Sequence, residues 1–249
     1  MSRGARSRNR EAAAGHVRVP GSDCDGSQVS SLLLGYPDEL LLERLPLLCT
    51  AAAPLPGELS TPLTRVLGHV ETTPLHRLQT EYVEVFDLRR RCCLYLTYYR
   101  YGDTRKRGMA LLQFKHLYAR AGLTLDSSEL PDHLAVVLEF AATGDAMRAE
   151  RLLQEHRAAV ELIRLSLEEH RSPYADVLRA VCATLPAVRA EDRDDALRLA
   201  REGPPTEDVG LDPYGATPFA PPEYIPHVPP PHPAPGALRP APSTSGASG

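Results

Sequence analysis

The sequence lacks the short patterns by which most enzymes are recognised. It contains no GxSxG nucleophile motif, no HExxH zinc motif and no P-loop, and no GxGxxG follows a strand-like segment. The segment Gly102–Gly108 (GDTRKRG) holds two glycines and several basic residues, but it has neither the GK[ST] ending of a phosphate loop nor a strand before it. We therefore predict a protein that is not an enzyme and that carries no cofactor of its own.

Cysteine is sparse and forms no CxxC pair, the five residues being Cys24, Cys49, Cys92, Cys93 and Cys182. An odd number without regular spacing indicates reduced thiols and not a disulfide framework. Adjacent thiolates do not easily reach one tetrahedral ion, and no second Cys or His pair lies nearby, so no metal site is expected. We expect Cys92 and Cys93 to pack as small apolar side chains.

Long apolar runs are missing as well. No segment of about 18 consecutive apolar residues occurs, which predicts no membrane span. The N-terminal arginines are not followed by the apolar stretch of a secretory signal, so a cytoplasmic location is expected. The isoelectric point is about 6.1 and the net charge is -4, which argues against binding of nucleic acid over a broad basic surface.

The composition changes at both ends of the chain. Fourteen of the 24 prolines lie after Gly203, and the first 26 residues carry five arginines, three acids and little apolar content. We therefore expect a flexible N-terminal segment (1–26), a globular domain (27–202) and a Pro-rich disordered tail (203–249).

Between these ends, apolar residues recur at three- and four-residue steps, which is the pattern of amphipathic helices. Asp38 and Asp145 stand where N-caps are expected, and Gly122 stands where a helix should end. No alternating apolar run occurs apart from 94–99, and a single strand has nothing to pair with. The prediction is an all-α fold, one compact domain of eight or nine helices.

Three helix boundaries follow from local signals. Thr61-Pro62 predicts a helix start, because proline is favoured at the first helical position. Ser128 is expected to cap the helix that follows Gly122, with Pro131 and Asp132 in its first turn. The stripe from 145 to 167 predicts one long amphipathic helix.

A basic segment interrupts this otherwise slightly acidic chain. From Phe86 to Arg107 the only acids are Asp87 and Asp103, against Arg89, Arg90, Arg91, Arg100, Arg105, Lys106 and Arg107. These cations bracket the apolar-aromatic run 94–99, so a groove with an apolar floor and an arginine rim would suit an amphipathic peptide. The same groove would suit a phosphate-bearing ligand. The alternative without a binding role is a run of charged side chains exposed to solvent. One side of the preceding helix carries Glu81, Glu84 and Asp87. These carboxylates would form an acidic face or would pair with the arginines that follow.

Two blocks of residues carry a resemblance to a known family. The first block comprises Tyr82-Val83-Glu84, Phe86-Asp87, Arg91, Leu94-Tyr95-Leu96-Thr97-Tyr98-Tyr99, Gly102-Asp103-Thr104-Arg105 and Arg107-Gly108. The second comprises Glu129-Leu130-Pro131-Asp132-His133-Leu134 and Leu138-Glu139-Phe140, and Ser172-Pro173-Tyr174-Ala175 follows later. In this order they resemble the nitrate reductase molybdenum-cofactor assembly chaperones, the NarJ type or delta subunit, over about residues 30 to 200.

The resemblance implies an all-helical member of the redox-enzyme maturation proteins. Such a chaperone would bind the apo catalytic (alpha) subunit of respiratory nitrate reductase in the cytoplasm, support insertion of the molybdenum cofactor, and then leave. The client's N-terminal segment is the expected peptide partner, and transient contact with the machinery that supplies the cofactor is also implied. Ala135, where the family pattern has proline, and the long tail depart from the family.

The client-binding residues that we predict on these grounds are Tyr82, Glu84, Phe86, Asp87, Arg91, Tyr98, Asp103, Arg105 and Arg107. Two other functions remain open at this point. One is a chaperone for another molybdenum oxidoreductase, of the dimethyl sulfoxide or trimethylamine oxide reductase type. The other is a nucleotide- or nucleic-acid-binding helical module, whose binding would depend on salt.

Overall fold

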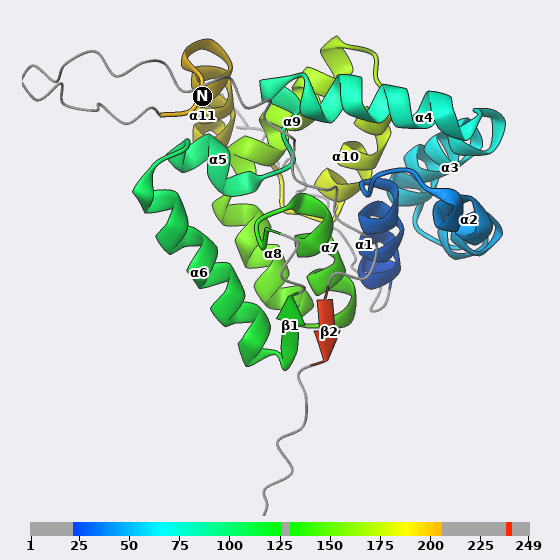
Figure 1. Cartoon of the computed structure of the whole chain (residues 1–249), viewed down its shortest axis with the longest axis horizontal. Coiled ribbons are helices and arrows are strands. Elements are labelled where there is room, and N and C mark those ends of the chain that lie inside the picture. The colour runs from blue at the N-terminus through cyan, green and yellow to red at the C-terminus, as the bar shows by residue number, and fades with distance from the viewer. Residues whose placement is uncertain (1–21, 126–129, 206–237, 241–249) are drawn as a thin grey trace, which may run out of the picture.

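A computed structural model of the chain describes residues 22–125, 130–205 and 238–240 (Figure 1). These residues form eleven α-helices, a π-helix, a 3-10 helix and two short strands. In chain order the elements are α1 (Ser22–Leu33), α2 (Glu39–Ala52), α3 (Gly57–Thr72), α4 (Leu75–Tyr82), η1 (Val83–Asp87), η2 (Arg90–Cys92), α5 (Leu96–Tyr101), α6 (Arg105–Arg120), β1 (Leu123–Leu125), α7 (Leu134–Thr143), α8 (Ala146–Glu155), α9 (Arg157–Glu169), α10 (Tyr174–Ala183), α11 (Ala190–Glu202) and β2 (Leu238–Pro240). The predicted all-α fold is confirmed.

Helix α7 forms the centre of the domain. Every side chain from Leu134 to Ala141 is buried, as expected for a helix that is apolar on all sides. Helices α1 and α8 pack directly against α7, while α10 packs between α3 and α9, and α11 lies on α9. In Figure 1, α6 runs down the left edge and α2 and α3 lie at the right, so the two outer groups of helices enclose α7 and α1.

The described part of the chain has eleven α-helices, two more than the nine at the upper end of the prediction, for two separate reasons. The run 94–99, considered above as a lone strand, instead ends in the short helix α5. The expected single helix over 145–167 divides at His156, whose backbone leaves the helical region (φ -109°, ψ 23°). The ring of His156 contacts the carbonyl oxygen of Leu152 at 3.0 Å, and a side chain that bonds to the backbone in this way competes with the helical hydrogen bonds.

The cap residues were predicted correctly, and the proline start was not. Asp38 accepts a hydrogen bond from the amide of Leu41 (2.8 Å), Asp145 caps α8, and Gly122 ends the run after α6 with a φ of 74°. The helix predicted to have Thr61 as its cap and Pro62 as its first residue begins five residues earlier, at Gly57, because the carbonyl of Pro56 already accepts the first helical bonds. Pro62 lies inside α3.

The start of α7 also differs from the prediction. Ser128, the expected cap, lies outside the described residues. Helix α7 begins at Leu134, and His133 caps it by accepting a hydrogen bond from the amide of Ala135 (3.2 Å) through Nδ1. Pro131 and Asp132 therefore precede the helix in a turn, and they do not form its first turn as predicted.

The two strands connect the domain to the far end of the chain. β1 pairs antiparallel with β2, with Leu123 opposite Pro240 and Leu125 opposite Leu238 (Figure 1). Three residues of the predicted tail, 238–240, form β2, and 206–237 and 241–249 lie outside the described residues. At the other end, α1 begins at Ser22, five residues before the expected domain boundary.

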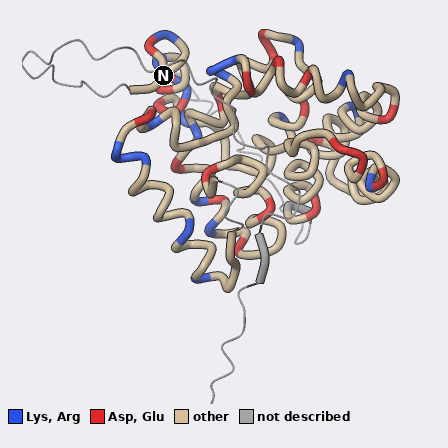
Figure 2. Tube along the Cα trace, viewed as in Figure 1, with Lys and Arg blue, Asp and Glu red and all other residues tan. Residues whose placement is uncertain are grey.

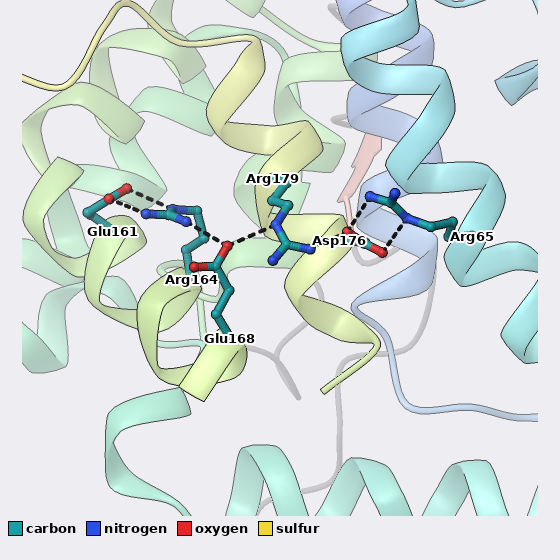
Figure 3. A network of polar contacts seen from close by, with 6 residues as sticks. All are labelled: Arg65, Glu161, Arg164, Glu168, Asp176 and Arg179. Carbon is teal, nitrogen blue, oxygen red and sulfur yellow. Dashed lines mark hydrogen bonds and ion pairs between the residues drawn. The ribbon is translucent and has the colours of Figure 1, made fainter. Parts of the chain in front are cut away.

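A chain of ion pairs joins α3, α10 and α9 across the side of the domain (Figure 3). Asp176 accepts from Arg65 at 2.8 and 2.9 Å and from Arg179, and Arg179 also reaches Glu168 at 2.8 Å. The chain continues to Arg164 and Glu161 on α9.

No helix of the part that the structure describes has the length and apolar character needed to span a bilayer.

Candidate functional site

The centre of the candidate site is a buried carboxylate between the two motif blocks. Asp132 is 0% exposed, and its Oδ2 accepts hydrogen bonds from the backbone amide (3.0 Å) and the hydroxyl of Thr97. The backbones of the two segments also bond, from the amide of Leu96 to the carbonyl of Asp132 (3.0 Å) and from the amide of Leu134 to the carbonyl of Leu94 (2.8 Å). The turn before α7 therefore fixes the first residues of α5.

Arg107 of α6 completes this cluster. Its Nη2 lies 3.9 Å from Oδ2 of Asp132, its Nε donates to the hydroxyl of Thr97 (3.3 Å), and its Nη1 donates to Asp103 (3.1 Å). The three contacts hold the beginning of α6 against α5 and the turn before α7. We call Thr97, Asp103, Arg107 and Asp132 the Asp132 cluster.

Aromatic rings cover the guanidinium of Arg107. Its Cζ lies 5.7 Å from the ring centre of Tyr95 and 5.8 Å from that of Tyr98, which are cation–π distances. Tyr95 in turn meets the ring of His133 edge-on at 5.1 Å. Arg107 is therefore held by carboxylates and rings on several sides, and its predicted contact with a client stays a prediction.

Two of the predicted binding residues lie in the core. Tyr82 is 1% and Phe86 7% exposed, and their ring centres are 4.7 Å apart. Tyr174 packs on both rings, and the hydroxyl of Tyr82 donates to the carbonyl of Leu34 (2.9 Å). The structure therefore places these rings in the packing between α4, η1 and α10, and their predicted contact with a client stays a prediction.

The remaining predicted residues are more accessible, and they lie in two groups. Glu84, Asp87 and Arg91 are exposed on η1 and η2, whereas Asp103 and Arg105 are exposed at the start of α6. Figure 2 shows the basic positions at the beginning of α6 apart from those between α4 and α5. The nine predicted residues thus do not form one continuous surface.

The π-helix η1 lies within the first of these groups. The amide of Leu88 bonds to the carbonyl of Val83 (3.1 Å), so the helix that begins as α4 widens by one residue per turn before it ends. Such segments are rare and occur frequently at functional sites. Sequence periodicity alone predicted a regular helix here.

The neighbouring cysteines are unsuited to thiolate chemistry in this conformation. Burial raises the pKa of Cys92 and of Cys93 to about 11, so both thiols are protonated at neutral pH. Among the residues that the structure describes, no group of three or more His, Cys, Asp or Glu side chains is arranged to hold a metal ion.

A wide groove of the described region begins at α5. A cavity of about 700 Å³ lies between α5, α11 and the α8–α9 junction, and a second of about 320 Å³ continues toward α6. Arg100, Glu155 and His156 line both. The apolar and aromatic lining side chains are Leu96, Tyr99, Tyr101, Phe114, Leu117, Leu152 and Leu199.

The charges of this groove are mixed, and its histidine is neutral. Arg189 pairs with Asp192 and Arg198 with Asp195, while Arg100 is exposed near the middle. Burial lowers the pKa of His156, and because a carbonyl only accepts, Nδ1 carries the hydrogen that reaches Leu152. The sequence predicted a groove with the run 94–99 as its floor and Arg89–Arg91 and Arg105–Arg107 as its rim. Leu96 and Tyr99 of that run line the observed groove, but none of those arginines does, and the contributions of α8, α9 and α11 were not predicted.

One glycine of the first motif block is required by the backbone. Gly102 ends α5 with a φ of 57° and a ψ of -153°, a conformation that side-chain-bearing residues rarely adopt. A Cβ at this position would also overlap the carbonyl oxygen of Pro205, which follows α11. The chain after α11 therefore passes directly over the turn between α5 and α6.

The two motif blocks that meet at the Asp132 cluster fall inside a family match. Residues 52–180, more than half of the chain, match the model of the nitrate reductase delta subunit. The chain belongs to the nitrate reductase delta subunit family. Helix α11, which contributes to the groove, lies outside the matched residues.

Named relatives include members with different architectures. The chain is 38% identical over 157 residues to the nitrate reductase-like protein NarX of Mycobacterium tuberculosis, covering 63% of this chain but 24% of NarX. It is 32% identical to the "Probable nitrate reductase molybdenum cofactor assembly chaperone NarJ" of Bacillus subtilis, covering 62% of this chain and 85% of that protein. It is 33% identical to the nitrate reductase molybdenum cofactor assembly chaperone NarJ of Escherichia coli, covering 59% and 64%. The chain thus spans about a quarter of NarX.

Proposed function

We propose that this delta-family chain is an assembly chaperone for the catalytic subunit of a respiratory nitrate reductase. It would bind that subunit before the molybdenum cofactor is inserted, without catalysing a reaction itself, and it would act in the cytoplasm. The observation that carries the proposal is the family match over residues 52–180, which contains both motif blocks. The names of the Bacillus subtilis and Escherichia coli relatives, both molybdenum cofactor assembly chaperones, support it.

The mechanism would rest on binding energy alone. A chaperone that binds the cofactor-free client more tightly than the mature client shifts the client toward the open state by the difference in binding free energy. Release then follows insertion, because the mature client offers the weaker binding surface. The absence of catalytic motifs from the sequence agrees with this mechanism.

The N-terminal segment of the client would enter the groove between α5, α6, α8 and α11. The two connected cavities give this groove an apolar floor with Arg100 exposed near its middle and acids along its length. Amphipathic segments bind such grooves by placing apolar side chains on the floor and charges at the rim. Arg105 and Asp103 at the start of α6, and Tyr98 beside them, would extend the contact.

Cofactor content of the client tests the chaperone function. The apo catalytic subunit would be produced with this chain, without it, and with a loosely folded control protein, and its molybdenum would be measured by mass spectrometry. We expect the molybdenum content of the client to rise only in the sample that contains this chain. Equal incorporation in all three samples would overturn the proposal.

Calorimetric titration tests the partner segment separately. The full chain would be titrated with a peptide that copies the N-terminus of the catalytic subunit, and with a scrambled peptide. Saturable binding of the true sequence alone is expected. Molybdenum incorporation without peptide binding would mean that the chain is a chaperone whose epitope lies elsewhere in the client.

A further inference from the structure

Arg157 is a buried cation with two unbonded nitrogens, and its charge is one of those that lower the pKa of Glu161. It is 5% exposed, and its Nε and Nη1 are fully buried and form no hydrogen bond with any described residue. A buried charge is costly unless it is paired and hydrogen-bonded, and a guanidinium cannot escape by losing its proton. Nε and Nη1 of Arg157 therefore call for an acceptor that the described residues do not supply.

The nearest acids are already engaged. Glu161 lies one turn farther along α9, but both of its oxygens accept from Arg164, at 2.5 and 3.1 Å (Figure 3). Asp192 accepts from Arg189 through both oxygens, at 3.0 and 3.1 Å. Two carboxylates near Arg157 are thus bound to other arginines, while Glu155 lines the same pocket without such an ion pair among the described residues.

Arg157 faces a pocket of about 300 Å³ between the end of α8, the start of α9 and the connection that leads to α11. Arg151 and Arg189 line the same pocket, so arginines from three separate segments meet there, together with Glu155 and Asp192. Pro186 and Ala187 form its apolar side. Arginine is the side chain best suited to bind oxyanions, because its planar fork donates two parallel hydrogen bonds.

The beginning of α9 adds positive potential to this pocket. Helix α9 has 13 residues, no acidic residue in its first turn and no side chain that caps its first amides. The helix dipole favours an anion at such an end, although the amides of Ala159 and Val160 already donate to the carbonyl of His156. The unbonded Nε and Nη1 of Arg157, the first residue of α9, favour a ligand of the same charge.

We propose that the pocket at Arg157 binds a tetrahedral oxyanion, the phosphate group of a small phosphate ester or free phosphate. Three arginines and a helix start offer donors from several directions, which suits the three or four oxygens of a phosphate better than the two of a carboxylate. The pocket adjoins the larger groove and shares Glu155, Arg189 and Asp192 with it. The organic part of an ester would extend into that groove.

Thermal unfolding of the full chain tests the site. The midpoint would be measured in phosphate, in acetate and in chloride, all at one ionic strength and pH. We expect phosphate to raise the midpoint above the value in chloride, with acetate close to chloride. Equal midpoints in phosphate and chloride would overturn the proposal, and an equal rise in acetate would overturn the phosphate assignment.

Variants separate binding from folding. In chloride, Arg157→Gln should unfold at the wild-type midpoint or above it, because an unpaired buried charge has been removed, and phosphate should no longer raise the midpoint. Arg151→Gln, at an exposed position of the same pocket, should weaken phosphate binding several-fold in calorimetry. Arg148→Gln, exposed on α8 outside the pocket, should retain the full phosphate effect. A phosphate effect that survives both pocket variants would contradict the site.

Comparison of the two phosphate sources completes the test. A phosphate ester, such as a ribose phosphate, should compete with inorganic phosphate for the site and bind at least as tightly if its organic part enters the groove. Sulfate, another tetrahedral oxyanion, would be tested in the same way. If neither the ester nor sulfate displaces phosphate, the observed effect is not binding at a tetrahedral oxyanion site, and the proposal is overturned.

Discussion

Thr97 and Asp132 are 35 residues apart in the sequence, and the carboxylate of Asp132 accepts both the amide and the hydroxyl hydrogen of Thr97. This pair joins the two motif blocks that identify the family. The other oxygen of Asp132, Oδ1, is buried without a partner among the described residues. Residues of both motif blocks therefore hold α5, α6 and α7 together.

We predict that Asp132→Ala lowers the free energy of unfolding by about 3 kcal/mol, because buried donors of Thr97 and Arg107 lose their acceptor. Asp103→Ala, which removes the other carboxylate bound to Arg107, should cost about 0.5 kcal/mol, since its side chain is 80% exposed. Urea unfolding measures both. Similar losses for the two variants would show that Asp132 is not the centre of the cluster.

We predict that Gly102→Ala destabilises the domain by about 1–3 kcal/mol through its positive φ, with a further cost from the overlap with Pro205. Gly108→Ala is the matched control, because Gly108 lies in α6 with open space around it. This change should stabilise the protein by about 0.5–1 kcal/mol. Thermal or urea unfolding of the two variants should therefore shift in opposite directions.

Asp176 should contribute to stability in a pH-dependent way. Burial alone would raise its pKa, but hydrogen bonds from Arg65 and Arg179 outweigh burial and lower the pKa (Figure 3). Because the folded pKa lies below the unfolded value of about 3.9, the contribution is present above that value and is lost as the pH falls through the folded pKa.

Asp176→Asn should therefore lower the free energy of unfolding by about 1 kcal/mol at pH 7, a value reduced by solvent screening of the exposed Arg65. The difference from wild type should shrink as the pH falls below about 4. Urea unfolding at pH 7, 5 and 3.5 measures this convergence. A difference that stays constant with pH would show that the ion pairs do not contribute.

The cysteines should react with alkylating agents in the order of their exposure. Cys49 is exposed, whereas Cys92 is fully buried and its pKa of about 11 leaves roughly 0.1% thiolate at pH 8. We expect Cys49 to be labelled first by iodoacetamide and Cys92 to be labelled only when the domain unfolds. Peptide mass spectrometry over time, with Cys49→Ser as control, checks this order.

Client binding should depend on the groove more than on Arg107. Arg107→Glu would place a second carboxylate beside Asp132, so loss of binding by that variant would also reflect unfolding. Arg100→Glu and Arg105→Glu change exposed positions, and each should weaken binding of the client peptide about tenfold without loss of helicity. Calorimetry and circular dichroism measure the two effects.

Arg77→Glu is the matched control for these reversals, because Arg77 is exposed on α4, which lines neither cavity. Arg100 lines both cavities, and Arg105 is the first residue of α6, a helix that lines the second. It should leave peptide affinity unchanged. Equal weakening by all three reversals would indicate a response to net charge alone, and unchanged affinity with folded Arg100→Glu and Arg105→Glu would exclude the groove as the peptide site.

The sequence by itself determined the helices, most of their caps and the family. Apolar spacing within a helix and a capping side chain three residues away are local features, so Asp38, Asp145 and Gly122 could be assigned without the fold. The break at His156 was missed because it depends on which hydrogen bond a ring makes, not on periodicity.

Only the tertiary structure decided which motif residues face solvent. Tyr82 and Phe86 carry the same family signal as Arg105, yet packing against Tyr174 from α10 places them in the core. The groove and the Arg157 pocket form only where α8, α9 and α11 meet. No sequence motif in α11 predicts that contact. Contacts between segments far apart in sequence are set by how apolar faces pack together, and no local pattern records them.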